Sequence, residues 1–234
     1  MKKDPTTLPA GHERLEKVMA HLGLASRREA KALIADGKVS VNGKVVHEAG
    51  YGVNPKDKID LAEMGQKSSY LVYKPRGIET SKTSPRSKDL HNIFPQFAQL
   101  SPIGRLDKDS EGLIIMSDDG TLTKALTKEN GTVGKTYLVT VRENISDTAL
   151  TKMAAGIILD NVKTKPAVTK RVSRNSFTII LHEGRKHQIR RMCDAVKLTI
   201  ESLVRIGIGH LSIEKMKPGT SKKLTDKDIA QLKA

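Results

Sequence analysis

The stretch GRLDKDSEGLIIMSDDG, residues 104–120, joins an acidic loop to an apolar run. The run LIIM predicts a buried strand, and the Asp-Gly pair that follows it predicts a turn. Ahead of the strand, Asp107, Asp109 and Glu111 occupy alternate positions. This spacing is how a calcium-binding loop begins, but it also fits a loop that presents one carboxylate to a substrate.

The calcium interpretation is disfavoured by the residues around the loop. Its twelfth position, where a calcium loop has a bidentate Glu, is Asp118. A calcium-binding hand also needs a helix leading into the loop, and Pro102 and Gly104 disfavour a helix there. We therefore expect a reactive carboxylate and no metal.

The charge balance predicts a polyanionic partner. The 234 residues include 41 Lys and Arg against 26 Asp and Glu, which gives a formal net charge of +15. Nucleic acid is the commonest partner of such a protein, and an anionic membrane is the second alternative. Hydrophobic residues make up 37% of the chain and charged residues 29%, which fits a folded globular protein.

No segment predicts membrane insertion or export. No apolar run approaches the ~18 residues that span a bilayer, and the opening MKKDPTTLPAGHE has no apolar core of a signal peptide. The one cysteine, Cys193, cannot form an internal disulfide, and we expect it in the core. A cytoplasmic protein without a membrane partner is the resulting expectation.

Residues 13–60 predict a small module after a flexible N-terminus of residues 1–12. Its first helix has apolar residues at positions i, i+3, i+4 and i+7 and ends at Gly23. These residues are Leu15, Val18, Met19 and Leu22.

A second helix and a hairpin complete the module. Ser26 and Glu29 have the spacing of a capping box at the start of SRREAKALIADGK, and Gly37 ends this helix. Its apolar side consists of Ala30, Leu33 and Ile34. In the following KVSVNGKVVH, the pair Asn42-Gly43 favours the two-residue turn of a tight hairpin.

The polar side chains of this module are mostly basic. Arg27 and Arg28 fall in the first turn of the second helix, where the helix dipole disfavours cations but phosphate binds readily. The order of helix, SRRE helix start and V-x-V-N-G-K hairpin resembles the S4 RNA-binding domain. The resemblance implies that Arg27, Arg28, Lys31 and Lys44 contact structured RNA.

After a linker at residues 61–69, residues 70–234 predict a second domain. Strands are expected in SYLVYK, GLIIMS, KTYLVTV, FTIIL and ESLVRIGIGHLSI, and helices in TLTKALTK, ISDTALTKMAAG, HQIRRMCDAV and residues 224–232. Residues 78–100 predict mostly loop with a short helix. Because strands and helices do not alternate regularly, we expect an α+β fold with a mixed, largely antiparallel sheet flanked by helices.

A strongly basic segment lies in this domain. Nine Lys or Arg residues occur between Lys163 and Arg191, against Glu183 as the only acid before Arg191. This density predicts a track for RNA phosphates. A carboxylate in such a field would stay ionised and would repel RNA, so it makes sense as a nucleophile or base that acts on a nucleotide.

Several motifs resemble the pseudouridine synthases of the RsuA type, which carry an S4 domain in front. They are YKPRG, GRLDKDSEGLIIMSDDG, KTYLVTV, EGRKHQIRRM and LVRIGIGHLSI…PGTSKKLTDKDI. The similarity covers about residues 13–232. The DKDS sequence and the KTYLVTV strand favour the RluF-like branch of the family. The resemblance implies isomerisation of uridine to pseudouridine in ribosomal RNA without a cofactor. The RNA of the large subunit is the favoured substrate. Transfer RNA or a pre-ribosomal particle is a further candidate substrate, and we expect a monomer.

The resemblance also implies roles for individual residues. Asp107 matches the reacting aspartate, Tyr137 the tyrosine that stacks on the flipped base, and Arg190 the basic residue that pairs with the aspartate. Without the resemblance, Tyr137 would equally fit a core position and Arg190 a phosphate contact. RNA contacts in this domain are expected from Arg105, Arg185, Lys186 and Arg191, and His187 is expected to be a phosphate or structural contact.

Two departures and one alternative accompany this interpretation. Ser110 replaces the usual Thr but keeps the hydroxyl, and Lys197 stands where relatives commonly have Gly. The second departure predicts a different ending for the helix before Lys197. The alternative function is a non-catalytic ribosome-assembly factor that binds RNA through its S4 domain.

Overall fold

The structure is a computed structural model. It describes residues 8–9, 11–25, 27–48, 50–62, 67–81, 87–128 and 131–234. The chain divides into two compact units, residues 1–67 with 119–124 and residues 68–118 with 125–234. Most of the expected flexible N-terminus, the centre of the expected linker and the expected cap Ser26 lie outside the described residues.

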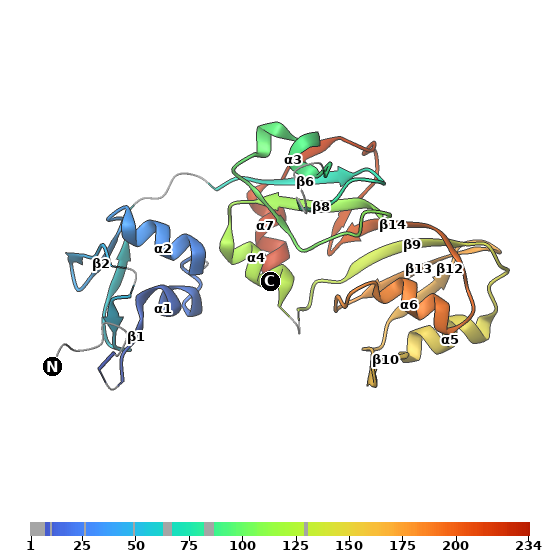
Figure 1. Ribbon diagram of the computed structural model, residues 1–234, viewed down its shortest axis with the longest axis horizontal. Coiled ribbons are helices and arrows are strands. Elements are labelled where there is room, and N and C mark those ends of the chain that lie inside the picture. The colour runs from blue at the N-terminus through green and yellow to red at the C-terminus, as the bar shows by residue number, and fades with distance from the viewer. Residues whose placement is uncertain are drawn as a thin grey trace. The chain divides into compact units, whose positions relative to one another are not determined.

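The first unit has two short helices beside small strands (Figure 1). Its elements are β1 (Glu13–Arg14), α1 (Leu15–His21), α2 (Arg27–Ala35), β2 (Val39–Val41), β3 (Lys44–Val45), β4 (Gly52–Val53) and β5 (Ile59–Leu61). Strand β2 pairs with β3 and β5, and β1 pairs with β4, all antiparallel. Leu15, Met19 and Ile34 of the helices form one apolar core with Val39 and Val41 of β2.

The local predictions for this unit hold at the hairpin and fail at one apolar position. Asn42 and Gly43 have φ angles of +52° and +79° and connect β2 to β3, which confirms the two-residue turn. Leu22 was expected on the buried face of the first helix but is 62% exposed. Leu22 is the C-cap residue of α1 and its N–H still donates to the carbonyl of Val18, but it does not join the apolar core of this unit.

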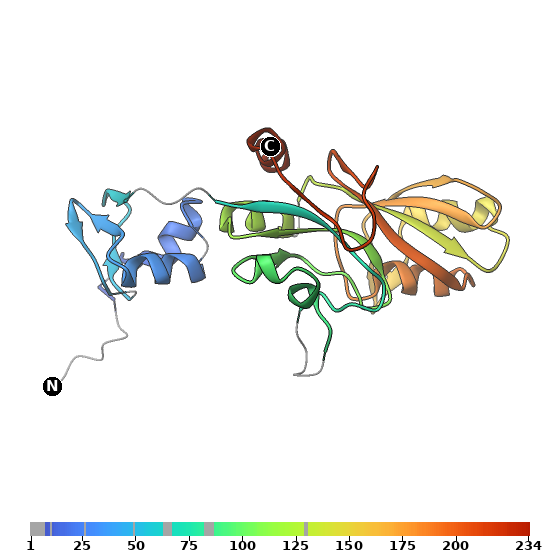
Figure 2. The same cartoon turned by 90° about the horizontal axis from the view of Figure 1, so that it is seen from above.

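The second unit is built on one twisted sheet (Figures 1 and 2). Its strands are β6 (Ser69–Lys74), β7 (Ser101–Ile103), β8 (Glu111–Ser117), β9 (Lys135–Val141), β12 (Val168–Arg171), β13 (Ser176–Leu181), β14 (Ile200–Ile208), β15 (Leu211–Ser212) and β16 (Ser221–Lys223). The order is β12-β13-β9-β14-β8-β6-β16, with β7 beside β8 and β15 beside β14. Within the described residues only β8 and β14 pair in parallel, so the mixed, largely antiparallel α+β sheet is confirmed.

Helices cover the sheet and build two apolar cores. The helices are α3 (Leu90–Ile93), α5 (Asp147–Ala155), α6 (Gln188–Ala195) and α7 (Asp226–Lys233), with a 3-10 turn at Pro95–Phe97. A further helix, α4 (Gly120–Thr127), spans the division between the two units. One core joins α5 and α6 to β9, β13 and β14 and includes Cys193, which confirms its core position. The other joins α3 and the 3-10 turn to β6 and β8. Tyr137 on β9 packs against both cores.

The expected Asp-Gly turn after β8 is a helix start instead. Gly120 is the first residue of α4, and the Asp119 side chain accepts hydrogen bonds from the backbone N–H groups of Thr121 and Leu122. The short strand β7, the edge strands β12 and β16, and the hairpin of β10 (Ile158–Leu159) and β11 (Val162–Lys163) were not predicted. Their two to four residues are too few to show a period, and most of them are at least partly exposed.

Helix α6 is followed by a residue in the left-handed conformation, which is usually glycine but is Lys197 here. Lys197 has φ +59°, and the N–H groups of Lys197 and Leu198 close the helix on the carbonyls of Asp194 and Cys193. The expectation of a different helix ending is therefore wrong, because the lysine adopts the left-handed conformation itself. None of the described helices, of at most nine residues, is long and apolar enough to cross a membrane.

Candidate active site

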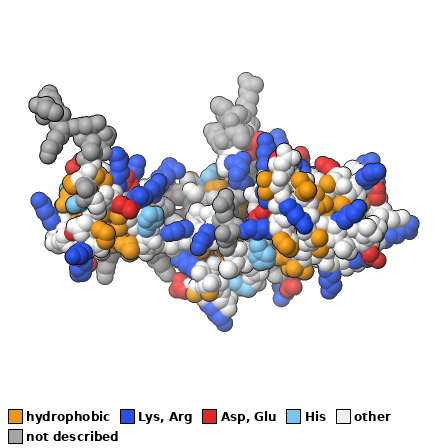
Figure 3. Space-filling view, turned by 90° about the horizontal axis from the view of Figure 1, so that it is seen from below, with side chains coloured by type: hydrophobic (Ala, Val, Ile, Leu, Met, Phe, Trp, Pro, Cys, Tyr) orange, Lys and Arg blue, Asp and Glu red, His pale blue; other side chains and the backbone are white. Residues whose placement is uncertain are grey.

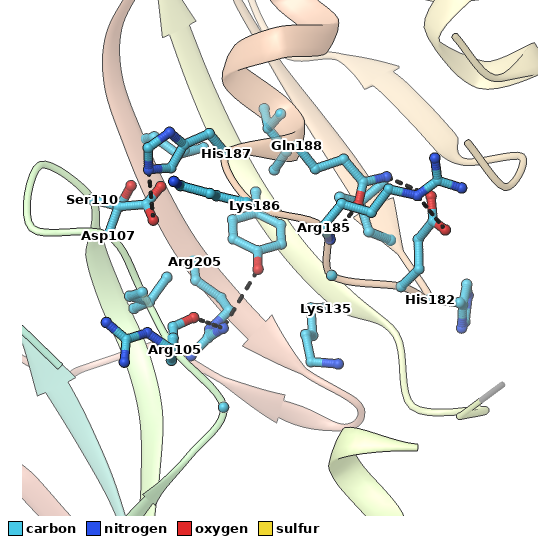
Figure 4. A pocket seen from close by; sticks show the side chains of 18 of the residues that line it. Arg105, Asp107, Ser110, Lys135, His182, Arg185, Lys186, His187, Gln188 and Arg205 are labelled. Atoms are coloured by element: carbon cyan, nitrogen blue, oxygen red, sulfur yellow. Dashed lines mark hydrogen bonds and ion pairs between the residues drawn. The ribbon is translucent and has the colours of Figure 1, made fainter. Parts of the chain in front are cut away.

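A cavity of about 760 Å³ opens in the second unit, where the 104–110 loop, β9, β14 and the start of α6 meet (Figure 4). The loop between β13 and α6 forms another wall. The cavity is lined by Arg105, Asp107, Ser110, Lys135, Tyr137, His182, Arg185, Lys186, His187, Arg190 and Arg205, among others. All three expected catalytic residues are therefore in one place, together with most of the expected RNA contacts of this domain.

Asp107 lies in a loop that is held from beneath. The buried hydroxyl of Thr80 donates to the carbonyl of Leu106 (2.6 Å) and accepts from its N–H (2.9 Å). On the other side of Asp107, the N–H of Gly77 donates to the carbonyl of Lys108 (2.8 Å). The loop backbone is thus fixed on both sides of Asp107, while its side chain stays 38% exposed to the cavity.

Two basic side chains of the α6 start approach the Asp107 carboxylate. Arg190 Nε lies 3.9 Å from Asp107 Oδ2, and His187 Nε2 lies 3.5 Å from Oδ1. Arg190 also donates through Nη2 to the buried hydroxyl of Ser110 (3.2 Å), which ties it to the same loop. The expected pair of Asp107 and Arg190 is therefore present in the geometry.

His187, which was expected to be a phosphate or structural contact, lies beside the Asp107 carboxylate (Figure 4). It precedes α6 in the left-handed conformation, with φ +53°. The loop before it is braced by Gln188, which accepts from the N–H of Arg185 and donates to Glu183 (2.6 Å). This brace, together with the uncommon backbone conformation, directs the imidazole toward Asp107.

Tyr137 is accompanied by an arginine that the sequence analysis missed. Arg205 of β14 pairs with Tyr137 across the sheet, and its Nη1 donates to the Tyr137 hydroxyl (3.4 Å). The arginine is only 2% exposed. The available signal was a single cation inside the apolar run LVRIGI, where burial of a charge needs a reason.

Lys74 is a second missed residue, at the end of β6. It is fully buried, and its Nζ donates to the carbonyls of Ile78 (2.7 Å), Pro75 (3.1 Å) and Lys108 (3.5 Å). Burial lowers the pKa of Lys74 to about 8, although the charges of Asp107 and Glu111 act in the opposite direction. Lys74 therefore supports the loop from below and does not face the cavity.

Lys135, at the start of β9, also lines the cavity and was not predicted. Its Nζ donates to the carbonyl of Leu126 (3.3 Å). Burial lowers the pKa of Lys135, and the positive charge of Arg205 acts in the same direction. The cavity thus has cationic groups on several sides of the Asp107 carboxylate.

The residues expected to bind RNA fall into three groups. Arg105 and Lys186 are exposed at the cavity. Arg185 donates to the carbonyls of Val162 and Lys163, and Arg191 forms an ion pair with Asp160 (2.6 Å), so both hold the β10–β11 hairpin. Arg27, Arg28, Lys31 and Lys44 are exposed on the first unit. Figure 3 shows Lys and Arg side chains spread widely over the visible face of the described residues.

The alternate carboxylates of the 104–113 loop do not converge. Within the part of the chain that the structure describes, no three His, Cys, Asp or Glu side chains are grouped so that they could hold a metal ion. The geometry of the loop is that of a presented carboxylate, with Asp107 in the cavity and Asp109 exposed outside its lining.

A carboxylate beside an arginine, an aromatic ring and a rim of lysines and arginines is the arrangement of an enzyme that acts on a nucleotide. Residues 68–195 match the family of RNA pseudouridylate synthases, and residues 13–59 match the S4 domain. The chain therefore belongs to the RNA pseudouridylate synthase family.

Relatives match over nearly the whole chain. The ribosomal large subunit pseudouridine synthase B of Bacillus subtilis is 35% identical over 95% of this chain and 96% of its own. The dual-specificity RNA pseudouridine synthase RluF of Escherichia coli is 31% identical over 96% of this chain and 80% of its own. The crystal structure of a pseudouridylate synthase superposes with a TM-score of 0.71 at 27% identity, over 94% of this chain and 99% of that one. The RsuA-type resemblance is thus confirmed, whereas the lean toward the RluF-like branch stays a prediction.

Proposed function

We propose that this protein converts uridine to pseudouridine in ribosomal RNA, with the RNA of the large subunit as the first candidate substrate. The observation that carries the proposal is Asp107, which faces the cavity with Arg190 and His187 at its carboxylate. The S4 domain, the net charge of +15 and the name of the Bacillus subtilis relative support ribosomal RNA as the substrate. Transfer RNA is a second candidate substrate, since the RluF relative is named dual-specific.

The proposed reaction is an intramolecular rearrangement. The bond between N1 of the base and C1′ of the ribose breaks, the freed uracil turns, and a bond between C5 and C1′ forms. The C5 proton is lost and N1 gains one, so atoms and electrons balance without a redox partner. Asp107 serves either as nucleophile at C1′ or as the base that removes the C2′ proton, and both routes need an ionised carboxylate held close to the sugar.

The other side chains have supporting roles in this proposal. Arg190 holds the carboxylate of Asp107 in position, and Ser110 fixes Arg190 in turn. Tyr137 stacks on the base after the nucleotide has left its helix, because the reacting atoms of a stacked uridine are out of reach. Arg105 and Lys186 at the exposed rim contact the neighbouring phosphates. We further propose a monomer that works in the cytoplasm.

The experiment is release of tritium from the C5 position of uridine in ribosomal RNA, measured at saturating RNA. Wild-type protein is expected to release tritium, and Asp107→Asn is expected to lower the rate by at least about a thousandfold while RNA binding is kept. Asp109→Asn is the matched control, since Asp109 is exposed in the same loop and outside the cavity lining. A chelator is expected to change nothing.

The outcomes separate the alternatives. Equal release by Asp107→Asn and wild type would remove Asp107 from its role. RNA binding without any release by the wild type, on RNA from a strain lacking this gene, would favour the non-catalytic assembly factor. Mapping the uridines that stay unmodified in that strain identifies the target nucleotide.

A further inference from the structure

Arg205 connects three parts of the cavity that are far apart in the sequence. Its Nε donates to the carbonyl of Leu113 (2.5 Å), and its Nη1 to the carbonyl of Arg105 (3.5 Å) and to the hydroxyl of Tyr137 (3.4 Å). The two carbonyls lie on either side of Asp107, two residues before it and six residues after it. One guanidinium therefore contacts both the segment that carries Asp107 and the side chain of Tyr137.

The chemistry of arginine determines how the Tyr137 hydroxyl is oriented. A guanidinium has five N–H donors and no acceptor, so in this contact the phenol oxygen must accept. The phenolic hydrogen consequently points away from Arg205. Because Tyr137 lines the cavity, its O–H is left to donate to a group inside it.

Stability alone does not explain an arginine at this position. Arg205 is almost fully buried, and its Nη2 has no hydrogen-bond partner among the described residues. A buried donor without a partner is unfavourable, and a buried ion can often be replaced by an apolar side chain of similar volume without loss of stability. Such a residue needs another reason for its presence.

The backbone of Arg205 is fixed independently of its side chain. It pairs with Gly112 at the start of β8, and a side chain at Gly112, which has φ +108°, would overlap the backbone of Arg205. The guanidinium therefore reaches the cavity from a rigid position. Its removal changes the contacts in the cavity without releasing the strand.

We propose that Arg205 is a positioning residue, which sets the distance between Asp107 and Tyr137 and directs the Tyr137 hydroxyl into the cavity, toward the flipped nucleotide. The inference rests on the proposed function and deepens it. Arg205 acts through two other residues, so its loss slows the chemical step and leaves RNA capture unchanged.

The test is a double-variant cycle with Arg205→Met, Tyr137→Phe and the combination of both. Single-turnover tritium release at saturating RNA, the RNA dissociation constant and the thermal unfolding temperature are measured for each. Arg142→Met is the control, since Arg142 forms an ion pair with Glu201 in the same unit and does not line the cavity. Arg205→Lys is added as a variant that keeps the charge but cannot reach all three oxygens.

Arg205→Met is expected to slow the chemical step on the order of a hundredfold with an unchanged dissociation constant and unfolding temperature. In the Tyr137→Phe background the same change is expected to cost much less, so the double variant falls within about threefold of the slower single variant. The proposal would be overturned if the rate loss of the double variant equalled the product of the two single losses. A loss confined to RNA binding would also overturn it.

The remaining outcomes are also decisive. If Arg205→Met does not fold, Arg205→Lys decides: a slow chemical step supports the proposal, and a wild-type rate overturns it. A wild type that releases no tritium contradicts the proposed function itself, whereas an active wild type with an unaffected Arg205→Met contradicts only the role of Arg205.

Discussion

Two charged side chains near the cavity, Asp107 and Lys74, differ in their exposure to water. Asp107 is partly exposed at the cavity and has Arg190 and His187 beside its carboxylate. Lys74 supports the same loop from inside the core, where its ammonium group donates to three backbone carbonyls. Asp107 is thus part of the loop and faces the cavity, whereas Lys74 contacts the same loop from the core.

This difference makes the stability of the protein depend on Lys74 in a defined pH range. Burial lowers the pKa of Lys74 from 10.5 to about 8 in the folded state, so between these values the unfolded chain binds more protons. Stability contributed at this site therefore rises as the pH rises from 8 to 10.5. The wild-type free energy of unfolding, minus that of Lys74→Met, is expected to grow by roughly 3 kcal/mol across that range.

The measurement is urea unfolding of both proteins at several pH values between 7 and 10.5. The difference between the two proteins cancels the titration of the other lysines. A difference that stays flat, or that falls with pH, would contradict the assignment of a lowered pKa to Lys74.

Helix α6 has a left-handed residue at each end, and the two ends have different purposes. At its start, His187 (φ +53°) brings its imidazole to Asp107. At its end, Lys197 (φ +59°) has an exposed side chain and only closes the helix. Left-handed backbone is unfavourable for any residue with a Cβ, so α6 carries conformational strain at both ends.

A pair of glycine variants separates strain from function in α6. Lys197→Gly is expected to raise the free energy of unfolding by about 1 kcal/mol with unchanged activity, because glycine adopts this conformation without strain. His187→Gly relieves the same strain but removes the imidazole beside Asp107, so we expect lower tritium release. Denaturant unfolding and single-turnover assays on both variants check this, and equal activities would exclude a functional role for His187.

We expect the first unit to bind RNA and the second unit to carry out the chemistry. The first unit exposes four basic side chains of the expected RNA surface, and the second contains the cavity. A net charge of +15 attracts RNA without selecting a sequence, so capture is expected to depend on salt, and the choice of nucleotide on the cavity.

Arg27→Ala is therefore expected to weaken RNA binding without slowing the reaction at saturating RNA. The slope of log affinity against log salt concentration is expected to become shallower by about one, because one phosphate contact is lost. Lys17→Ala is the matched control, since Lys17 already forms an ion pair with Glu13 (2.8 Å) on the same unit. Lower turnover at saturating RNA would contradict this division of roles.

Local sequence patterns were sufficient wherever neighbours along the chain create the structure. Spacing among a few adjacent residues was enough to predict the Asn42-Gly43 turn, the helices α2, α5 and α6, and the longer strands β8, β9, β13 and β14. The motif around Asp107 likewise indicated the family, since several such motifs occur in order. The short edge strands escaped because their structure comes from the strand that they pair with.

Only the tertiary structure decided which basic residue contacts which partner. The sequence places Arg185, Arg190 and Arg191 within seven positions, yet only Arg190 approaches Asp107, because successive helical residues point about 100° apart. Arg185 and Arg191 reach a hairpin more than twenty positions earlier. Arg205 meets Tyr137 and Leu113 across 68 and 92 positions, a proximity that β14 creates by lying between β9 and β8.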